Sequence, residues 1–290
     1  MSSDQEQSKR GISETMHIQL PEAFSKTHIA ALGKYFRNRS TLSRAEWSDL
    51  FEAIDLLRGA RVTLGEATYT FAEVYESVVE AIYADTFVQR VLLAKDIAVE
   101  GARLRDELAK RILGDLREKG LYDPQVFASQ ILSGFCLYWW YAFTKGYAFE
   151  IEIIRDLEAS GLAFTAHDLR TRKGRRSPYD LIIQGYQGDI KSSTYFMIAA
   201  RTAALSTDFY ITLLFDRRTR RRMRVVMLQE AVWAAINGET RPAKLEAVTA
   251  VFPAAAEILV GEHQRLIVVE YERWKQRLLQ RQKTSEEGKQ

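Results

Sequence analysis

The chain has 290 residues, of which 47% are hydrophobic and 27% are charged, and its formal net charge is +3. This composition is ordinary for a globular protein, and the length is sufficient for two domains with separate cores. Cys136 is the only cysteine, which excludes an internal disulfide, and one cysteine with four scattered histidines does not make a usual zinc site. The polar N-terminus lacks a secretory signal, and we expect a cytoplasmic protein.

The first half of the chain shows the hydrophobic periodicity of helices. Apolar side chains recur along one face over residues 44–58, and the same period continues over residues 71–83 and 86–119 with few glycines. We therefore predict a disordered segment over residues 1–15, followed by an all-helical domain over residues 16–145. This domain has no repeat and no DNA-reading motif, so substrate positioning, dimerisation and partner binding stay open as its role.

One uncharged stretch, from Gln125 to Thr144, is about 20 residues long, which is enough to cross a bilayer. Aromatic side chains crowd its end, between Tyr138 and Phe143. Glutamine, serine and threonine residues dilute it, however, and it continues without a linker into the next helix. We expect no membrane span here, but a buried helix or a subunit interface, which would make the protein a homodimer through Tyr138–Phe143.

The second half begins with a helix and a strand. The helix opens at Gly146–Glu150, its apolar stripe continues through Ile153, and Gly161 is a suitable C-cap. The alternate positions Leu162, Phe164, Ala166 and Asp168, of which the first three are apolar, then predict a first strand.

Residues 177–191 are typical of a β-hairpin that carries chemistry. A short apolar strand leads to a turn at Gly185 and Gly188, and a second strand begins at Asp189. Because side chains alternate along a strand, Asp189 and Lys191 project to one side, and the hairpin register can set Asp180 of the partner strand beside them. Two carboxylates suit Mg²⁺, and an adjacent ammonium group suits negative charge on a phosphate.

The remaining pattern completes an ordered series of elements. Residues 194–206 can form a short helix, residues 209–215 an apolar fourth strand, and residues 223–228 a fifth. The helix, three strands, helix and strand, with the acidic residues and the lysine described above, resemble the PD-(D/E)XK nuclease superfamily over residues 146–216. One departure is Tyr179, which stands between Pro178 and Asp180, whereas the superfamily's name places proline directly before the acid.

This resemblance implies an α+β protein with a restriction-endonuclease-like domain, in which helices flank a mixed β-sheet with an αβββαβ core. We place that domain at residues 146–281, with a disordered tail over residues 282–290. The resemblance further implies a metal-dependent endonuclease that cuts DNA with Mg²⁺ or Mn²⁺. Asp180 and Asp189 would be metal ligands together with the backbone carbonyl of Ile190. Glu150 would bind a second metal or orient water, and Lys191 would position the attacking water.

Charge is unevenly distributed along the chain. Residues 1–145 carry 18 basic and 20 acidic side chains, whereas residues 146–290 carry 23 and 18, so the basic excess lies with the proposed nuclease. Two dense clusters are candidates for binding a phosphate backbone, although each alone would also suit a solvated turn. They consist of Arg170, Arg172, Lys173, Arg175 and Arg176 before the hairpin, and of Arg217, Arg218, Arg220, Arg221, Arg222 and Arg224 between the fourth and fifth strands.

Two other classes of function stay open. The same fold could hold nucleic acid or a protein partner without cutting, although three clustered carboxyl groups repel one another unless a cation lies among them. Alternatively, the chain could be a helical interaction protein with an unrelated α+β tail. The four polar residues by themselves would also suit a set of surface salt bridges, with Lys191 paired to Asp180 or Glu150, and such pairs contribute little to stability. A divalent cation between Asp180 and Asp189 would distinguish the nuclease from both.

Overall fold

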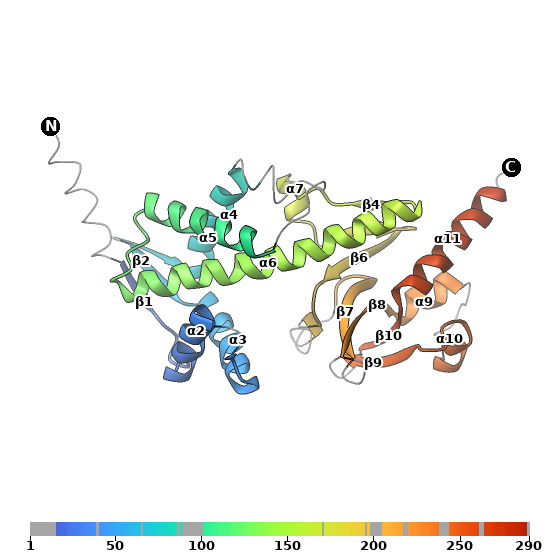
Figure 1. Cartoon of the computed structure of the whole chain (residues 1–290), viewed down its shortest axis with the longest axis horizontal. Coiled ribbons are helices and arrows are strands. Elements are labelled where there is room, and N and C mark those ends of the chain that lie inside the picture. Colours follow the sequence, from blue (N-terminus) through green and yellow to red (C-terminus); the bar gives the residue numbers. More distant parts are fainter. Residues whose placement is uncertain are drawn as a thin grey trace. The chain divides into compact units, whose positions relative to one another are not determined.

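The computed structural model describes residues 16–38, 41–64, 66–85, 88, 101–169, 171–194, 196–197, 205–216, 220–237, 244–260 and 264–288. The chain divides into two compact units, Met1–Thr144 and Lys145–Gln290. Both units contain helices and strands, so the protein is α+β (Figure 1). The boundary between the units falls inside one helix, α6 (Phe127–Ser160). The segment predicted to be disordered, 1–15, lies outside the described residues.

The N-terminal unit is not all-helical, so that prediction was wrong. Besides helices it holds an antiparallel sheet of three described strands in the order β1-β2-β3, with bounds Met16–Gln19, Arg61–Leu64 and Ala67–Thr70. Each strand is only four residues long, and β3 is largely exposed. Such strands bury few side chains and show little hydrophobic alternation, and their pairing depends on backbone hydrogen bonds that a periodicity search does not detect.

Helices account for most of the remaining N-terminal unit. Those that precede α6 are α2 (Lys26–Asn38), α3 (Arg44–Arg58), α4 (Phe71–Ala84) and α5 (Gly101–Glu118). α3 and α4 both begin with a capping box, in which Ser43 pairs with Glu46 and Thr70 with Glu73. Reciprocal capping satisfies backbone N–H groups that a helix leaves unpaired, and so fixes where the helix begins. Most of residues 86–100, where we expected a longer helix, lie outside the described part.

The helix α6 is longer than the sequence suggested. We predicted a new helix from Gly146, but Gly146 lies inside a continuous helix that begins at Phe127. The glycine does not interrupt the helix, because its backbone takes helical geometry and no neighbouring atom lies within 4 Å of a Cβ placed there. The long uncharged stretch and the helix that carries Glu150 are therefore one element.

The aromatic side chains of α6 pack within the N-terminal unit. The ring of Tyr138 lies 5.4 Å from that of Tyr35, and Trp140 and Phe143 both contact Tyr83, at 5.4 and 5.9 Å between ring centroids. Trp140 is only 2% exposed. Because these rings have partners in the same chain, the aromatic cluster gives no support to a homodimer through Tyr138–Phe143. None of the described helices combines the length and apolarity needed to cross a bilayer.

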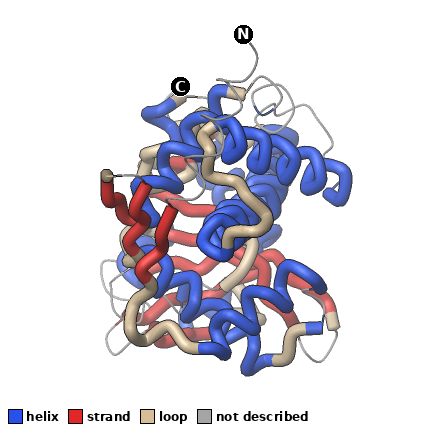
Figure 2. Tube along the Cα trace, turned by 90° about the vertical axis from the view of Figure 1, so that its left-hand side faces the viewer, coloured by secondary structure: helices blue, strands red, loops and turns tan. Residues whose placement is uncertain are grey.

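The C-terminal unit is built on a sheet of seven described strands in the order β4-β5-β6-β7-β8-β10-β9. Figure 2 shows the strands of the chain in red and its helices in blue. Neighbouring strands are antiparallel except for β6 and β7, which are parallel. The strands are β4 (Phe164–Ala166), β5 (Leu181–Ile183), β6 (Tyr186–Lys191), β7 (Phe209–Asp216), β8 (Arg221–Gln229), β9 (Ala256–Val260) and β10 (Gln264–Glu270). Most of the helix expected over residues 194–206 lies outside the described residues, although positions 196–197 are helical.

Helices cover one face of this sheet. Apolar residues of α6 join the sheet in one buried cluster with those of α9 (Glu230–Asn237), α10 (Leu245–Val251) and α11 (Tyr271–Glu287). Sheet residues in this cluster include Ile190, Phe209 and Ile211. A smaller cluster on the opposite face includes Tyr210, Val225 and Met227. The alternation along β7 and β8 therefore divides each strand between two cores.

The expected disordered tail is mostly helical. α11 continues to Glu287, where Gly288 caps it, so residues 282–287 are ordered in a helix. The prediction failed because this segment is polar on most sides. Gln282, however, faces back toward the sheet, and its side-chain oxygen accepts a hydrogen bond of 2.9 Å from the Ala163 N–H. A tertiary contact of this kind extends a helix that hydrophobic periodicity alone would end earlier.

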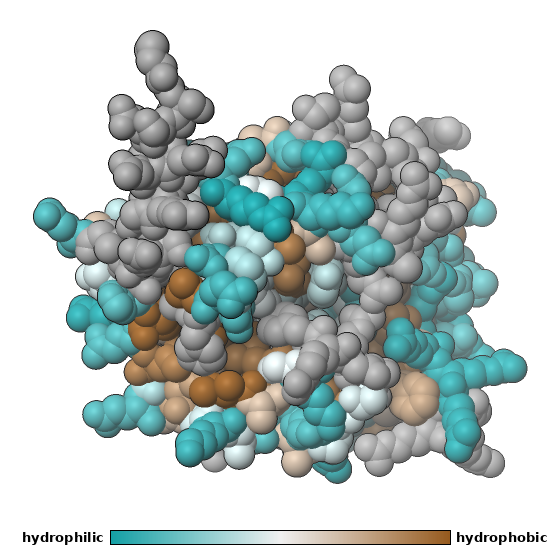
Figure 3. Space-filling model, turned by 60° about the vertical axis from the view of Figure 1, so that its left-hand side comes forward, coloured by the Kyte–Doolittle hydropathy of each residue, from teal (hydrophilic) through white to brown (hydrophobic). Residues whose placement is uncertain are grey.

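A few large hydrophobic side chains are exposed, whereas many other described apolar residues are buried. On the face shown in Figure 3, hydrophobic side chains form patches bordered by hydrophilic ones. The exposed large side chains are Ile29, Tyr69, Phe215, Met223, Val251 and Leu259. Scattered exposure of this kind is normal, so only a patch with a distinct chemical setting calls for a functional explanation.

Candidate active site

The hairpin β5–β6 is tighter than the sequence predicted. Its turn consists of Gln184 and Gly185, whose φ values are +51° and +88°, and β6 begins directly afterwards at Tyr186. Two-residue turns with positive φ match the twist of antiparallel strands and favour glycine in the second position. We had predicted that Gly188 would be part of the turn, but it lies within β6.

Gly188 makes room for a core side chain. It pairs with Phe209 on the parallel strand β7, and a Cβ at position 188 would lie 2.1 Å from the Phe209 Cζ atom. Phe209 is fully buried and its ring lies 5.2 Å from that of Trp274. The missing side chain at 188 thus allows the phenyl ring to pack over the strand, which fixes β6 against the core just before its functional residues.

The hairpin register brings Asp180 and Asp189 together. Leu181 pairs with Gly188, so continuing the same register by one residue sets Asp180 opposite Asp189. The Ile190 N–H donates a 2.7 Å hydrogen bond to Asp180 Oδ2, and Lys191 Nζ donates one of 2.7 Å to Asp189 Oδ1. Ile190 itself points into the core. Asp189 and Lys191 consequently share the face opposite to Ile190, as the alternation of the strand required.

The two aspartates also interact directly with each other. Burial, a hydrogen bond with Asp189 and the charges of Glu150 and Asp189 raise the pKa of Asp180 from 3.8 to about 9, against the opposing charge of Lys191. A hydrogen bond between two carboxyl groups requires that one of them hold a proton. At neutral pH, without a cation, Asp180 is therefore the protonated partner of the pair.

Glu150 and Lys191 complete the electrostatics of the site. Glu150 extends from α6 and is 8% exposed. Burial alone would lower the pKa of Lys191, but the negative charges of Asp189, Asp180 and Glu150 and the hydrogen bond to Asp189 raise it. The lysine is accordingly a stable ammonium ion, and its side chain is 40% exposed, so it can be reached from solvent. The structure thus brings all four polar residues predicted for the site into one electrostatic group.

Only some of the residues that we predicted as magnesium ligands are arranged to bind the ion together. Within the described residues, no set of three or more His, Cys, Asp or Glu side chains has the arrangement of a metal site. Glu150 acts on Asp180 by its charge, but it does not join the two aspartates as a third ligand. Mg²⁺ commonly takes one or two protein carboxylates and completes its shell with water and substrate phosphate. Asp180, Asp189 and the Ile190 carbonyl meet that smaller requirement, and a cation would relieve the repulsion that keeps Asp180 protonated.

Thr212 is a neighbour of the site that the sequence did not identify. It pairs with Lys191 across the parallel strands and is completely buried, and its hydroxyl has no hydrogen-bond partner among the described atoms. Residues paired across a sheet project from the same face, so this hydroxyl lies on the side of Lys191. The available signal was a polar residue within the apolar run 209–215.

The two basic clusters differ in how much of them the structure describes. Residues Arg172–Arg175 form the short helix α7, capped by Thr171, and Arg172, Lys173 and Arg176 are exposed. Arg220, Arg221 and Arg222 are exposed at the start of β8. Arg224, in contrast, forms ion pairs with Glu152 and Glu272 and therefore has a structural role. Arg170, Arg217 and Arg218 lie outside the described residues.

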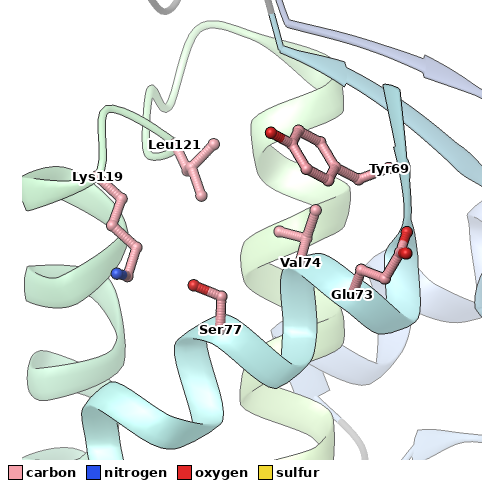
Figure 4. A pocket seen from close by; sticks show the side chains of 6 residues that line it. All are labelled: Tyr69, Glu73, Val74, Ser77, Lys119 and Leu121. Carbon is pink, nitrogen blue, oxygen red and sulfur yellow. The ribbon is translucent and has the colours of Figure 1, made fainter. Parts of the chain in front are cut away.

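The N-terminal unit contains an open pocket of about 380 Å³. Figure 4 shows the Tyr69 ring and the Ser77 hydroxyl directed toward it, with the Lys119 amine at its edge. Glu73 is occupied with capping, because its carboxylate accepts a 2.6 Å hydrogen bond from the Thr70 N–H. The residues that line this pocket therefore provide no pair of available carboxylates, whereas the β5–β6 hairpin does. The pocket is lined by Tyr69, Glu73, Val74, Ser77, Lys119 and Leu121.

No family model matches the sequence, and comparison with curated proteins and with solved structures found no significant match. The function is therefore inferred from the geometry and chemistry of the chain itself.

Proposed function

We propose that this protein is a divalent-metal-dependent endonuclease of the PD-(D/E)XK type, which hydrolyses phosphodiester bonds in DNA. The observation that carries the proposal is the meeting of Asp180, Asp189 and Lys191 on one hairpin, with the charge of Glu150 acting on the same group. Two carboxylates beside an ammonium group form an arrangement that binds a cation and opposes the charge of a phosphate.

The order of the elements supports a restriction-endonuclease-like core. α6 is followed by the antiparallel strands β4, β5 and β6, and β7 then lies parallel to β6. A parallel neighbour requires the chain to cross over between the two strands, here through residues 192–208. This order is similar to the helix, three strands, crossover and strand of the resembled core, and β6 with its functional residues lies in the interior of the sheet rather than at its edge.

Each polar residue of the site would have its own role in phosphodiester hydrolysis. Bound Mg²⁺ would supply Lewis acidity toward the phosphate and lower the pKa of a coordinated water. Asp180 and Asp189 would hold the cation with the Ile190 carbonyl, and Asp180 would give up its proton on binding. Lys191 would then turn from Asp189 toward the phosphate, where its ammonium group offsets the charge that builds up during hydrolysis. Glu150 would orient water by hydrogen bonding from α6.

The decisive experiment is the substitution Lys191→Ala. Because the ammonium group acts mainly in the transition state, cleavage should fall by about 10²- to 10³-fold, while DNA affinity should fall only by the share of one phosphate contact. Supercoiled plasmid, linear duplex, single strands and a branched junction would each be incubated with Mg²⁺ and with Mn²⁺, and nicking followed over time. Lys283→Ala, which removes an exposed lysine of α11, is the matched control.

Each result distinguishes the nuclease from a binding module. Cutting by the wild type and the control, with loss of cutting in the Lys191 variant, supports the proposal. Equal rates in all three proteins remove Lys191 from catalysis. Tight binding without any cutting by the wild type favours the catalytically silent module. One observation is specific to that second candidate: Lys191 pairs with Asp189 and the pKa of Asp180 is raised, so the charges of these three hairpin residues balance at neutral pH without a metal.

A further inference from the structure

The hairpin formed by β7 and β8 presents an exposed aromatic ring. Phe215, near the end of β7, is 60% exposed. It pairs directly with Arg222 on β8, so the two side chains project from the same face of the hairpin. Met223, the next residue of β8, is 47% exposed on the opposite face. Two exposed large apolar side chains thus lie on one hairpin.

This ring lies among positive charges that the described residues do not compensate. Arg220, Arg221 and Arg222 are exposed, and none of them forms an ion pair with a side chain in the described part of the chain. Arg224 stands two residues further along the same face as Arg222, and there Glu152 and Glu272 neutralise it. Arg224 therefore has a structural role in the described part of the chain, and Arg222 does not. From Arg222 toward the turn, the positive charge is available for a partner.

The hairpin extends beyond the candidate active site along the same strands. Thr212 on β7 pairs with Lys191 on β6, and Phe215 lies three residues further toward the end of β7. At about 3.3 Å per residue, this separation is roughly 10 Å along the strand. Because side chains alternate along a strand, Phe215 projects from the face opposite to Thr212 and Lys191. A polynucleotide held at Lys191 would therefore reach the Phe215 ring by passing around the end of the hairpin.

We propose that the end of the β7–β8 hairpin binds an unpaired nucleobase, which stacks on Phe215 while Arg220, Arg221 and Arg222 hold the adjoining phosphates. The inference rests on the proposed function and specifies its substrate class as DNA with unpaired bases, such as single strands, flaps or branched ends. In an intact duplex both faces of each base are covered by neighbouring bases, and a side chain can stack only on a base that has lost them. An exposed ring beside exposed arginines combines the two contacts that single-stranded nucleic acid offers.

The test measures binding separately from cutting. Binding of the full-length protein to a fluorescent single-stranded oligonucleotide and to a blunt duplex of equal length would be measured by anisotropy in EDTA, with no metal. Phe215→Ala should weaken single-strand binding by about 5- to 150-fold, the range expected when one base no longer stacks, and change duplex binding by less than about twofold. Phe215→Trp should retain single-strand affinity, whereas Phe215→Leu should lose it. Leu259→Ala, at another exposed apolar position, on β9, is the control and should change neither.

The outcomes separate this inference from the proposed nuclease activity. Selective loss of single-strand binding in Phe215→Ala supports the inference even if the wild type cuts no substrate. Equal losses on both ligands, no loss on either, or full retention by Phe215→Leu overturn it, even if Lys191-dependent cutting is found. Failure of the wild type to bind single strands also overturns it. Anionic phospholipid vesicles form a further arm, and Phe215-dependent binding to vesicles without an effect on the oligonucleotide would assign the hairpin to a membrane surface instead.

Discussion

At the scale of single residues, the site is defined by two carboxyl groups that the fold holds too close for both to be ionised. The Ile190 N–H fixes one oxygen of Asp180, and Lys191 fixes one oxygen of Asp189. Neither aspartate can move away without losing its hydrogen bond. The protein therefore maintains an unfavourable arrangement of charge, which a proton relieves in the absence of a cation and which a divalent cation would relieve more completely.

The raised pKa of Asp180 makes a pH-dependent prediction. Its pKa is about 9 in the folded state and near 3.8 in the unfolded chain, so between these values the folded state binds more protons. Stability from this group is complete below about pH 4 and is lost as the pH rises toward 9. Without metal, Asp180→Asn should therefore be more stable than the wild type, by an increment that grows between about pH 5 and 9 at a rate of at most about 1.4 kcal/mol per pH unit.

Urea denaturation of both proteins in EDTA at acidic, neutral and mildly alkaline pH measures this increment. Asp189→Asn should not reproduce it in full, because that change also leaves Lys191 without its carboxylate partner. A constant difference between wild type and Asp180→Asn across the pH range would contradict the assignment of the proton to Asp180.

Gly188 gives a second residue-scale prediction. Gly188→Ala would place a methyl group where the Phe209 ring lies, and overpacking of this kind costs about 1–3 kcal/mol. Gly146→Ala is the matched control, since it lies in a helix with no atom within 4 Å and should stabilise by up to about 1 kcal/mol. Thermal unfolding monitored by circular dichroism should therefore shift in opposite directions. A stable Gly188 variant would show that Phe209 packs elsewhere.

At the scale of elements, the β7–β8 hairpin serves two purposes along its length. Near its base, Val226 and Leu228 belong to the main core, and Arg224 joins the hairpin to α6 and α11 through Glu152 and Glu272. Toward the turn, the arginines are exposed and have no such partners among the described residues. Two strands can continue beyond the core because hydrogen bonds between their backbones still pair them. The exposed arginines lie on this part of the hairpin, outside the core.

The arginines at the end of this hairpin should control the salt dependence of DNA binding. Replacing Arg220, Arg221 and Arg222 together by glutamine should weaken duplex binding and reduce the slope of log K against log salt by up to about 0.9 for each phosphate that is no longer neutralised. Arg224→Gln should lower stability by breaking its ion pairs but leave the slope unchanged. Binding isotherms at several salt concentrations measure this slope for each protein. An unchanged slope in the triple variant would show that this end of the hairpin is an ordinary solvated surface.

At the scale of the whole molecule, the candidate active site belongs to the unit Lys145–Gln290, while α6 also runs through the unit that precedes it. Glu150 lies on that helix, and the main core of the C-terminal unit includes its neighbours Phe149 and Ile153. A ligand that binds the site therefore stabilises an arrangement built from residues far apart in the chain, and its effect should appear in global unfolding.

Divalent cations should raise the melting temperature of the intact protein. A ligand that binds only the folded state stabilises it by about 2.7 kcal/mol at about one hundred times its dissociation constant, which is several degrees for a chain of this size. Millimolar Mg²⁺ or Mn²⁺ should produce this shift in the wild type and a much smaller one in Asp180→Asn, with metal-free buffer and EDTA as references. Equal shifts in the two proteins would remove the hairpin carboxylates from metal binding.

The sequence by itself determined the elements whose signal is local. The periodic helix at residues 44–58, the apolar strand at 209–215 and the placement of Asp189 and Lys191 on one side of β6 all follow from spacing along the chain, because backbone geometry repeats about every 3.6 or every two residues. The same local reasoning failed for β1 to β3, whose short polar strands depend on partners, and for Gly146, which lies within the long helix α6 without interrupting it.

Only the tertiary structure decided how these local pieces interact. Strand register set Asp180 opposite Asp189, and Phe209 required a glycine at 188. Burial raised the pKa of Asp180, and Glu152 with Glu272 separated Arg224 from the exposed arginines beside it. These properties arise from groups that are distant in the chain and adjacent in space. Electrostatic coupling and steric exclusion depend on distance in three dimensions, and that distance becomes defined only when the sheet and its helices have packed together.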